Sequence, residues 1–236
     1  MSEGNFVAHE LRVPDVAAGA AFYGDLFGWT ATDSPTGRQL RAGHLTIGGV
    51  SRVKDGIPAH WSGCVAVTDV LAAVDTAVQR GATVTTPTGA PVDLPGQGKL
   101  APMLDPARGF FLLAEPAAEV ATGTDGTFAW HRLYATDPAA AIAFYQAVLP
   151  WRAPVAGSHR FLLPEGKPVA EVVRATGTAQ HWLPYVLVND LEAACSLAAE
   201  LGATVHADRH ALTTGGRSRV IVDPQGAELG LCANTG

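Results

Sequence analysis

Polar side chains that could do chemistry lie on the predicted opening strand of each half, at Glu10 and Arg12 in the first and at Arg132 and Tyr134 in the second. Alternate residues of a strand face opposite sides, so the charged members of each segment share one face. A shielded carboxylate can act as a general base, and an arginine or a phenol can stabilise a developing oxyanion. The candidate catalytic residues are Glu10, Arg132, Tyr134 and, near the C-terminus, Glu228.

A structural role is the alternative interpretation of the same charges. Arg132 and Glu228 could form a buried ion pair, and Glu10 and Arg12 could satisfy each other. The sequence leaves both alternatives open.

Histidines occupy the other face of the same strands. His9 alternates in phase with Leu11 and Val13, which must face a helix, and His131 holds the matching place in the second segment. Shifting the strand by one residue would bury charged side chains against an apolar helix, at a cost of several kcal/mol. We therefore predict that both histidines are structural.

The chain is a tandem duplication. Residues 6–29 match residues 128–151 at 10 of 24 positions, and residues 60–84 match residues 181–205 at 12 of 25. The second match starts at His60 and His181, each followed by Trp, which we interpret as a repeated loop or interface feature. We predict two domains, 1–117 and 123–236, joined near residues 117–127.

A finer unit repeats twice in each half. Four apolar runs end at an aspartate that suits a helix N-cap: Asp15, Asp69, Asp137 and Asp190. Short β-rich runs follow each helix, and Gly48-Gly49 is expected to form a hairpin turn. The predicted fold is α+β, with two strand–helix–three-strand modules per half forming an eight-stranded curved sheet around a cleft.

These patterns resemble a known family. H-E-L-x-V-x-D before A-F-Y-G-D-L-F-G-W, H-W before V-x-V-x-D, and D-P-Q-G-A-E-L are similar to the vicinal-oxygen-chelate superfamily of glyoxalases, bleomycin-resistance proteins and extradiol dioxygenases. The resemblance covers both halves and is nearest to tandem two-domain glyoxalase-like proteins. It implies a divalent metal held from the first, fifth and last strands of a half.

The positions that the resemblance assigns to metal ligands hold poor donors. They are Ala8, Ser62 and Leu113 in the first half and Trp130, Leu183 and Gly230 in the second. Divalent sites need imidazole, carboxylate or thiolate donors, so we expect no metal and no other cofactor. With the same strand phase, the expected ligand-binding residues are Arg12, Ser62, Cys64, Phe111, Trp130, Leu183 and Tyr185.

Composition narrows the function classes. The net charge of −6 with scattered basic residues argues against nucleic acid. The chain shows no signal-like start and no apolar run long enough for a bilayer, so we expect a cytoplasmic protein without membrane contact, monomeric or homodimeric. Three cysteines without a Cys-x-x-Cys pair indicate small buried residues.

We expect a protein that binds a small apolar or aromatic metabolite without a metal. It would sequester that molecule or convert it by a lyase- or isomerase-type proton transfer. One alternative is a metal-dependent lyase, isomerase or dioxygenase whose ligands are displaced. The other is a partner-binding scaffold with vestigial clefts.

Overall fold

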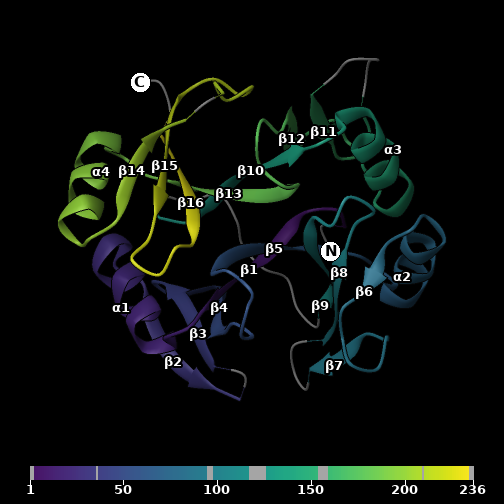
Figure 1. Cartoon of the computed structure of the whole chain (residues 1–236), viewed down its shortest axis with the longest axis horizontal. Helices are drawn as coiled ribbons and strands as arrows, with labels where there is room; N and C mark the ends of the chain where they lie inside the picture. The colour runs from purple at the N-terminus through teal and green to yellow at the C-terminus, as the bar shows by residue number, and fades with distance from the viewer. Residues whose placement is uncertain are drawn as a thin grey trace. The chain divides into compact units, whose positions relative to one another are not determined.

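The computed structural model describes residues 3–35, 37–94, 98–116, 126–153, 159–208 and 210–233. Each half of the chain forms one mixed sheet (Figure 1). The first-half strands run β2-β3-β4-β1-β5-β9-β8-β6 with β7 paired to β8, and the second-half strands run β11-β12-β10-β13-β16-β15-β14. The predicted α+β fold of two curved mixed sheets is confirmed.

The first half contains β1 (Phe6–Val13), α1 (Val16–Phe27), β2 (Thr30–Ser34), β3 (Gly37–Ala42), β4 (Leu45–Arg52), β5 (His60–Ala66), α2 (Val70–Gln79), β6 (Thr83–Val84), β7 (Val92–Leu94), β8 (Gly98–Leu104) and β9 (Phe110–Pro116). The second half contains β10 (Phe128–Ala135), α3 (Pro138–Val148), β11 (Arg160–Leu162), β12 (Pro168–Arg174), β13 (His181–Leu187), α4 (Leu191–Glu200), β14 (Thr204–Ala207), β15 (Arg217–Val222) and β16 (Glu228–Ala233).

Each module closes by a parallel strand pair: β1 with β4, β5 with β9, β10 with β12, and β13 with β16. The sheets have nine and seven described strands rather than the expected eight. The short β7 adds one strand to the first half. Between α3 and β13 the described residues form only β11 and β12, with an isolated bridge between Arg152 and Leu162.

All four predicted helix caps are present. The carboxylates of Asp15, Asp69 and Asp190 each accept a hydrogen bond of 3.0 Å from a backbone N–H in the first turn. Asp137 accepts two such bonds, and Pro138 follows it at the first helical position. These bonds satisfy amides that have no partner inside the helix, which is why every helix begins where the sequence predicts.

The predicted hairpin turn at Gly48-Gly49 is wrong. Both glycines lie inside β4, and the chain reverses before them, at Gly43 with φ 59°. A Cβ on Gly48 would lie 1.7 Å from the carbonyl oxygen of His9, so the parallel strand β1 can approach only a glycine there. The glycine pair therefore marks a close backbone approach, not a turn.

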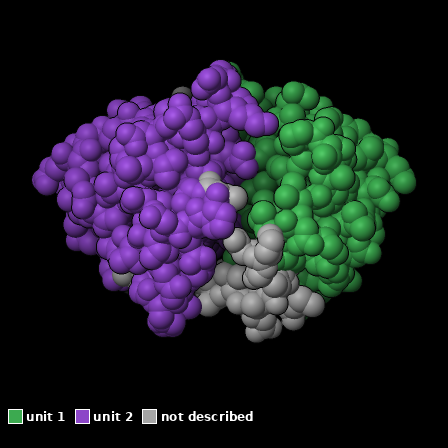
Figure 2. Space-filling view, turned by 90° about the horizontal axis from the view of Figure 1, so that it is seen from below, with its two compact units in different colours: residues 1–7, 63–119, 131–182 green, residues 8–62, 120–130, 183–236 purple. Residues whose placement is uncertain are grey.

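The chain packs into two compact units, each built from both halves (Figure 2). Unit 1 comprises residues 1–7, 63–119 and 131–182, and unit 2 comprises residues 8–62, 120–130 and 183–236. In unit 1, α2 contacts α3, and in unit 2, α1 contacts α4. The predicted junction lies almost wholly outside the described residues, so the domain boundaries stay a prediction.

Each unit has its own core with a repeated hydrogen-bonded network. In unit 1, Tyr145 of α3 donates to Asp105 at 2.9 Å and accepts from Trp182 Nε1 at 2.9 Å. In unit 2, Tyr23 of α1 donates to Asp223 at 3.0 Å, and Trp61 Nε1 donates to Tyr23 at 2.9 Å. The Phe-Tyr, His-Trp and Asp-Pro signatures thus recur because they fasten a helix of one half to a turn of the other.

Burial, and then the neighbouring aspartate, raise the pKa of both tyrosines. Both hydroxyls therefore stay protonated and keep donating. No helix in the described part of the chain is long and apolar enough to span a bilayer.

Candidate functional site

The alternation of β1 separates core from site as predicted. His9 is 3% exposed, and its ring stacks on Phe128 with centroids 3.5 Å apart. Burial lowers its pKa from 6.5 to about 3, although a hydrogen bond with the backbone of Ile47 opposes the shift. His131 likewise stacks on Phe6 at 3.5 Å. Both histidines belong to the packed interior.

Glu10 and Arg12 lie on the opposite face of β1, which we call the inner face because it does not pack on the helices. Burial raises the pKa of the Glu10 carboxyl, against the opposing effects of a hydrogen bond from Ser51 and the charge of Arg12. Glu10 lies beside Gly49 on β4, where a Cβ would come within 2.7 Å of Glu10 Oε2. The strand pair thus makes room for one carboxyl group whose proton affinity is increased.

His60 and Ser62 extend this polar group onto β5. His60 Nδ1 lies 2.8 Å from the carbonyl oxygen of Pro58, and because a carbonyl only accepts, Nδ1 carries the proton and Nε2 the lone pair. Burial, and further the charge of Arg12, lower the pKa of His60 despite that hydrogen bond. Ser62 is 1% exposed, and its Oγ has no hydrogen-bond partner among the described residues.

These five side chains, Glu10, Arg12, Ser51, His60 and Ser62, form the first-half polar group, and all belong to unit 2. The sequence predicted Glu10, Arg12 and Ser62. It missed Ser51 and His60 as members, although the duplicated His-Trp pair was a usable signal for His60.

The predicted ligand-binding residue Phe111 lies in the core instead. It packs edge-on against Phe144 and Tyr145, with centroids 6.0 and 5.4 Å apart, and Leu113 belongs to the same core. Across the parallel pair, Cys64 of β5 is opposite Leu112, which is the residue on its face.

The error has a local cause in the turn before β9. The D-P-x-G pattern ends in a glycine in the second half, but the first half reads D-P-A-R-G, and its left-handed residue is Arg108 with φ 73°. The matching position of the second half is Gly226 with φ 95°. Counting from Gly109 therefore shifted the strand by one residue.

Cys64, Cys195 and Cys232 are all buried. Burial raises the pKa of the Cys232 thiol to about 11, so this cysteine stays protonated. The structure thus agrees with the prediction of small buried residues.

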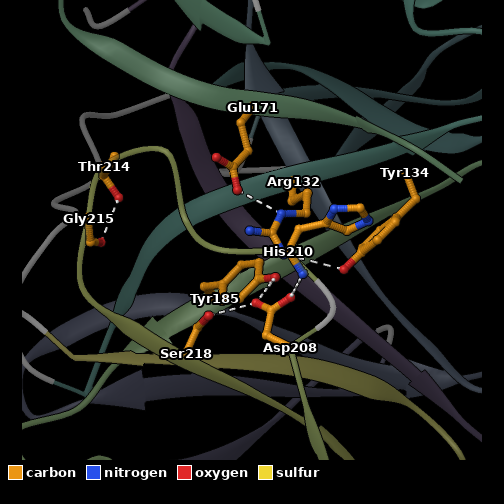
Figure 3. Close-up of polar contacts among 9 residues, drawn as sticks. All are labelled: Arg132, Tyr134, Glu171, Tyr185, Asp208, His210, Thr214, Gly215 and Ser218. Carbon is orange, nitrogen blue, oxygen red and sulfur yellow. Dashed lines mark hydrogen bonds and ion pairs between the residues drawn. The ribbon is translucent and has the colours of Figure 1, made fainter.

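In the second half, Arg132 is paired with a residue that the sequence did not suggest. Its Nε lies 2.6 Å from Glu171 of β12, and both side chains are 0% exposed (Figure 3). The expected partner Glu228 is exposed at the start of β16, so it provides no shielded base. The only sequence signal for Glu171 is a charge inside the apolar run P-V-A-E-V-V.

Tyr134 completes this part of unit 1. Its hydroxyl lies 3.4 Å from Arg132 Nη1, and its ring stacks on His181 with centroids 4.9 Å apart. The predicted catalytic residues Arg132 and Tyr134 are therefore adjacent, within a buried ion-pair network.

The remaining second-half residues belong to unit 2. The hydroxyls of Tyr185 and Ser218 donate to the same Asp208 oxygen at 2.9 and 2.7 Å (Figure 3). Tyr185 is paired with Gly230 across the strands, and a Cβ on that glycine would lie 2.2 Å from the tyrosine ring. Asp208 was not predicted, because it follows β14 in a segment without a motif.

The residues present do not fit a divalent metal. With the corrected last strand, the positions assigned to ligands hold Ala8, Ser62, Leu112, Trp130, Leu183 and Gly230. None offers an imidazole, carboxylate or thiolate. The described part of the chain also contains no cluster of three His, Cys, Asp or Glu side chains arranged to hold an ion.

Comparisons with known proteins identify the family. The Glyoxalase-like domain family matches residues 7–113 and 130–232. CFP32 of Mycobacterium tuberculosis is 30% identical over 240 residues, covering 92% of this chain and 90% of CFP32. The anthracycline biosynthesis protein DnrV of Streptomyces peucetius is 31% identical over 249 residues, covering 92% of this chain and 89% of DnrV.

Among solved structures, the 2,3-dioxygenase LapB from Pseudomonas sp. KL28 is similar with a TM-score of 0.69. The similarity covers 100% of this chain and 94% of LapB at 14% identity, and it concerns the fold alone. Both halves match the family separately, and the relatives align over nearly their whole length. The chain therefore belongs to the glyoxalase-like domain family.

Proposed function

We propose that this chain binds a small aromatic metabolite without a divalent metal and that Glu10 accepts a proton from it. The observation that supports the proposal most directly is the lack of metal-ligating side chains at the family's ligand positions on the inner faces. The positions that the family assigns to metal ligands hold no imidazole, carboxylate or thiolate. On the same strand as Ala8, the Glu10 carboxyl has a raised pKa. A base whose pKa moves toward neutrality is suited to take a proton from a weak carbon or phenol acid.

The first-half polar group supplies parts for such a transfer. The acidic C–H or O–H bond of the ligand would break, its proton would pass to the Glu10 carboxylate, and the electron pair would remain on a ligand oxygen. Arg12 is the nearby positive charge, and Ser62 Oγ can donate a hydrogen bond to that oxygen. His60 carries its lone pair on Nε2 and can accept from a ligand hydroxyl.

The relatives favour an aromatic ligand. DnrV and DauV are both described as anthracycline biosynthesis proteins, and both align with 92% of this chain. We extend that chemistry to this chain as a proposal: the ligand class is a polycyclic phenol or aryl ketone of secondary metabolism. Phenols have acidic O–H groups, and aryl ketones with α-hydrogens have acidic C–H bonds next to the carbonyl group.

The test uses the purified full chain in buffer with EDTA and a panel of polycyclic phenols and aryl ketones. Thermal shift measures binding, and deuterium incorporation from D₂O into the ligand, followed by NMR, measures proton transfer. Glu10→Gln should lower the exchange rate by about 100-fold or more. Glu200→Gln, an exposed carboxylate at the end of α4, is the matched control and should exchange like the wild type.

Because the basic form of Glu10 is required, exchange should rise with pH through its raised pKa. Equal exchange in Glu10→Gln would refute the role of the carboxylate. If both binding and exchange need added Mn²⁺, Fe²⁺ or Zn²⁺ and vanish in EDTA, the metal-dependent alternative is correct instead.

A further inference from the structure

One tryptophan of the chain differs from the other four in its hydrogen bonding. The indole N–H groups of the four each donate a hydrogen bond: Trp29 to Gly126 O (2.6 Å), Trp61 to Tyr23 Oη (2.9 Å), Trp151 to Gly4 O (2.7 Å) and Trp182 to Tyr145 Oη (2.9 Å). Trp130 is 6% exposed, and its Nε1 has no hydrogen-bond partner in the described part of the chain. A buried N–H without an acceptor is costly, and such a group calls for an explanation.

The place of Trp130 in the fold indicates where an acceptor would come from. It occupies the first-strand position of the second half that the family assigns to a metal ligand, the position of Ala8 in the first half. Trp130 is buried but belongs to neither helix-facing core, and the same holds for Leu183 and Tyr185. β10, β13 and β16 are neighbours in the sheet, so these residues lie on one inner face.

The other aromatic side chain on this inner face of unit 2, Tyr185, is held in place by its neighbours. Asp208 accepts hydrogen bonds from the Tyr185 and Ser218 hydroxyls on the same carboxylate oxygen (Figure 3). The tyrosine ring lies against Gly230. Leu183 adds an aliphatic side chain from the same strand as Tyr185. The face therefore combines aromatic and aliphatic side chains with a buried polar group, the Trp130 N–H, that has no hydrogen-bond partner among the described residues.

We propose that the second half binds a planar aromatic molecule with a carbonyl or quinone oxygen, and that Trp130 Nε1–H donates a hydrogen bond to that oxygen. An indole N–H only donates, so the ligand must supply an acceptor. The residues of this site lie on the second-half sheet, whereas the proton-transfer group lies on the first-half sheet.

The experiment compares two soluble probes of equal shape, 9,10-anthraquinone-2-sulfonate and anthracene-2-sulfonate, which lacks the two carbonyl oxygens. The ¹⁵N-labelled full chain gives one indole N–H signal per tryptophan, and Trp130→Phe identifies the signal of Trp130 by its disappearance. The quinone should move the Trp130 signal downfield, whereas the hydrocarbon should not. Trp130→Phe should weaken quinone binding by roughly three- to tenfold and leave hydrocarbon binding unchanged.

Several results would overturn the proposal: no saturable binding of the quinone, a Trp130 signal that stays in place at saturation, or an equal effect of Trp130→Phe on both probes. The last would indicate apolar packing alone. If Trp130→Phe disturbs the other four indole signals, the wild-type titration alone decides between the probes. Glu10→Gln should show the same Trp130 shift as the wild type, so a failure of the proposed proton transfer is distinguishable from a failure here.

Discussion

Acid titration of His9 tests the strand orientation on which both proposed sites rest. The ring is buried and stacked on Phe128, with its pKa lowered from 6.5 to about 3. A histidine with a depressed pKa remains neutral in the folded protein while the unfolded chain takes up a proton below about pH 6.5. Its contribution to stability is therefore fully present above that pH and is lost as the pH falls toward 3.

The size of the effect follows from the shift. A difference of about 3.5 units at 1.36 kcal/mol per unit corresponds to roughly 5 kcal/mol of unfolding free energy, lost between pH 6.5 and 3. From pH 7 to pH 5 the loss attributable to His9 is about 2 kcal/mol. That is a change of about 4–8 °C in melting temperature for a chain of this size.

The assay is urea unfolding of the wild type, His9→Phe and His44→Gln at pH 7, 6 and 5. Phenylalanine keeps a ring against Phe128 but does not titrate, so His9→Phe should lose about 2 kcal/mol less than the wild type on acidification. His44 is exposed, and His44→Gln should follow the wild type. Parallel curves for the wild type and His9→Phe would refute the buried, neutral ring, and a wild-type stability that falls with EDTA would show a ligating histidine.

Three further changes probe the packing around the sites. Tyr145→Phe removes a donor to buried Asp105 and should destabilise unit 1 by about 1–3 kcal/mol in urea unfolding; no loss would show that the network is not formed. Arg132→Met leaves Glu171 buried without its cation and should cost about 3–5 kcal/mol, with the double variant Arg132→Met, Glu171→Leu recovering most of it; equal losses would contradict a desolvated pair. Gly230→Ala should displace the Tyr185 ring and weaken quinone binding in titration calorimetry while leaving Glu10-dependent exchange unchanged; unchanged quinone affinity would show that the ring does not shape that site.

Much of the fold could be predicted because its determinants are local. An aspartate that caps a helix acts within three residues, and alternation along a strand fixes which side His9 and Glu10 take. The duplication also helps the prediction, since a residue pair that is repeated in both halves makes the same contact twice. The Trp of each His-Trp pair donates a hydrogen bond to the equivalent tyrosine.

The failures involve contacts that only long-range register decides. The partner of Arg132 lies 39 positions away on a parallel strand, and nothing local distinguishes Glu171 from Glu228. Phe111 was misplaced because Arg108 takes a backbone conformation that usually belongs to glycine. Gly48-Gly49 resembles a turn in sequence, but the lack of a side chain at Gly48 is what lets the backbone of β1 lie close to β4.

The equivalent parallel strand pairs of the two halves, β1 with β4 and β10 with β12, carry different side chains, which argues for different roles. In the first half Glu10 is opposite Gly49, and in the second Arg132 is opposite Glu171. Each pair therefore carries one carboxylate, but on different strands. In the second half the Glu171 carboxylate lies 2.6 Å from the Arg132 guanidinium, and both side chains are fully buried. In the first half Gly49 places no side chain opposite Glu10, and burial raises the pKa of the Glu10 carboxyl against the opposing charge of Arg12. Gly49→Glu would place two carboxylates together, whereas the double change Glu10→Arg, Gly49→Glu would recreate the second-half pair and should abolish proton transfer while keeping the fold. The duplicated scaffold thus carries its carboxylate on the first strand of one half and on the neighbouring strand of the other, so the proposed proton transfer applies to the first half alone.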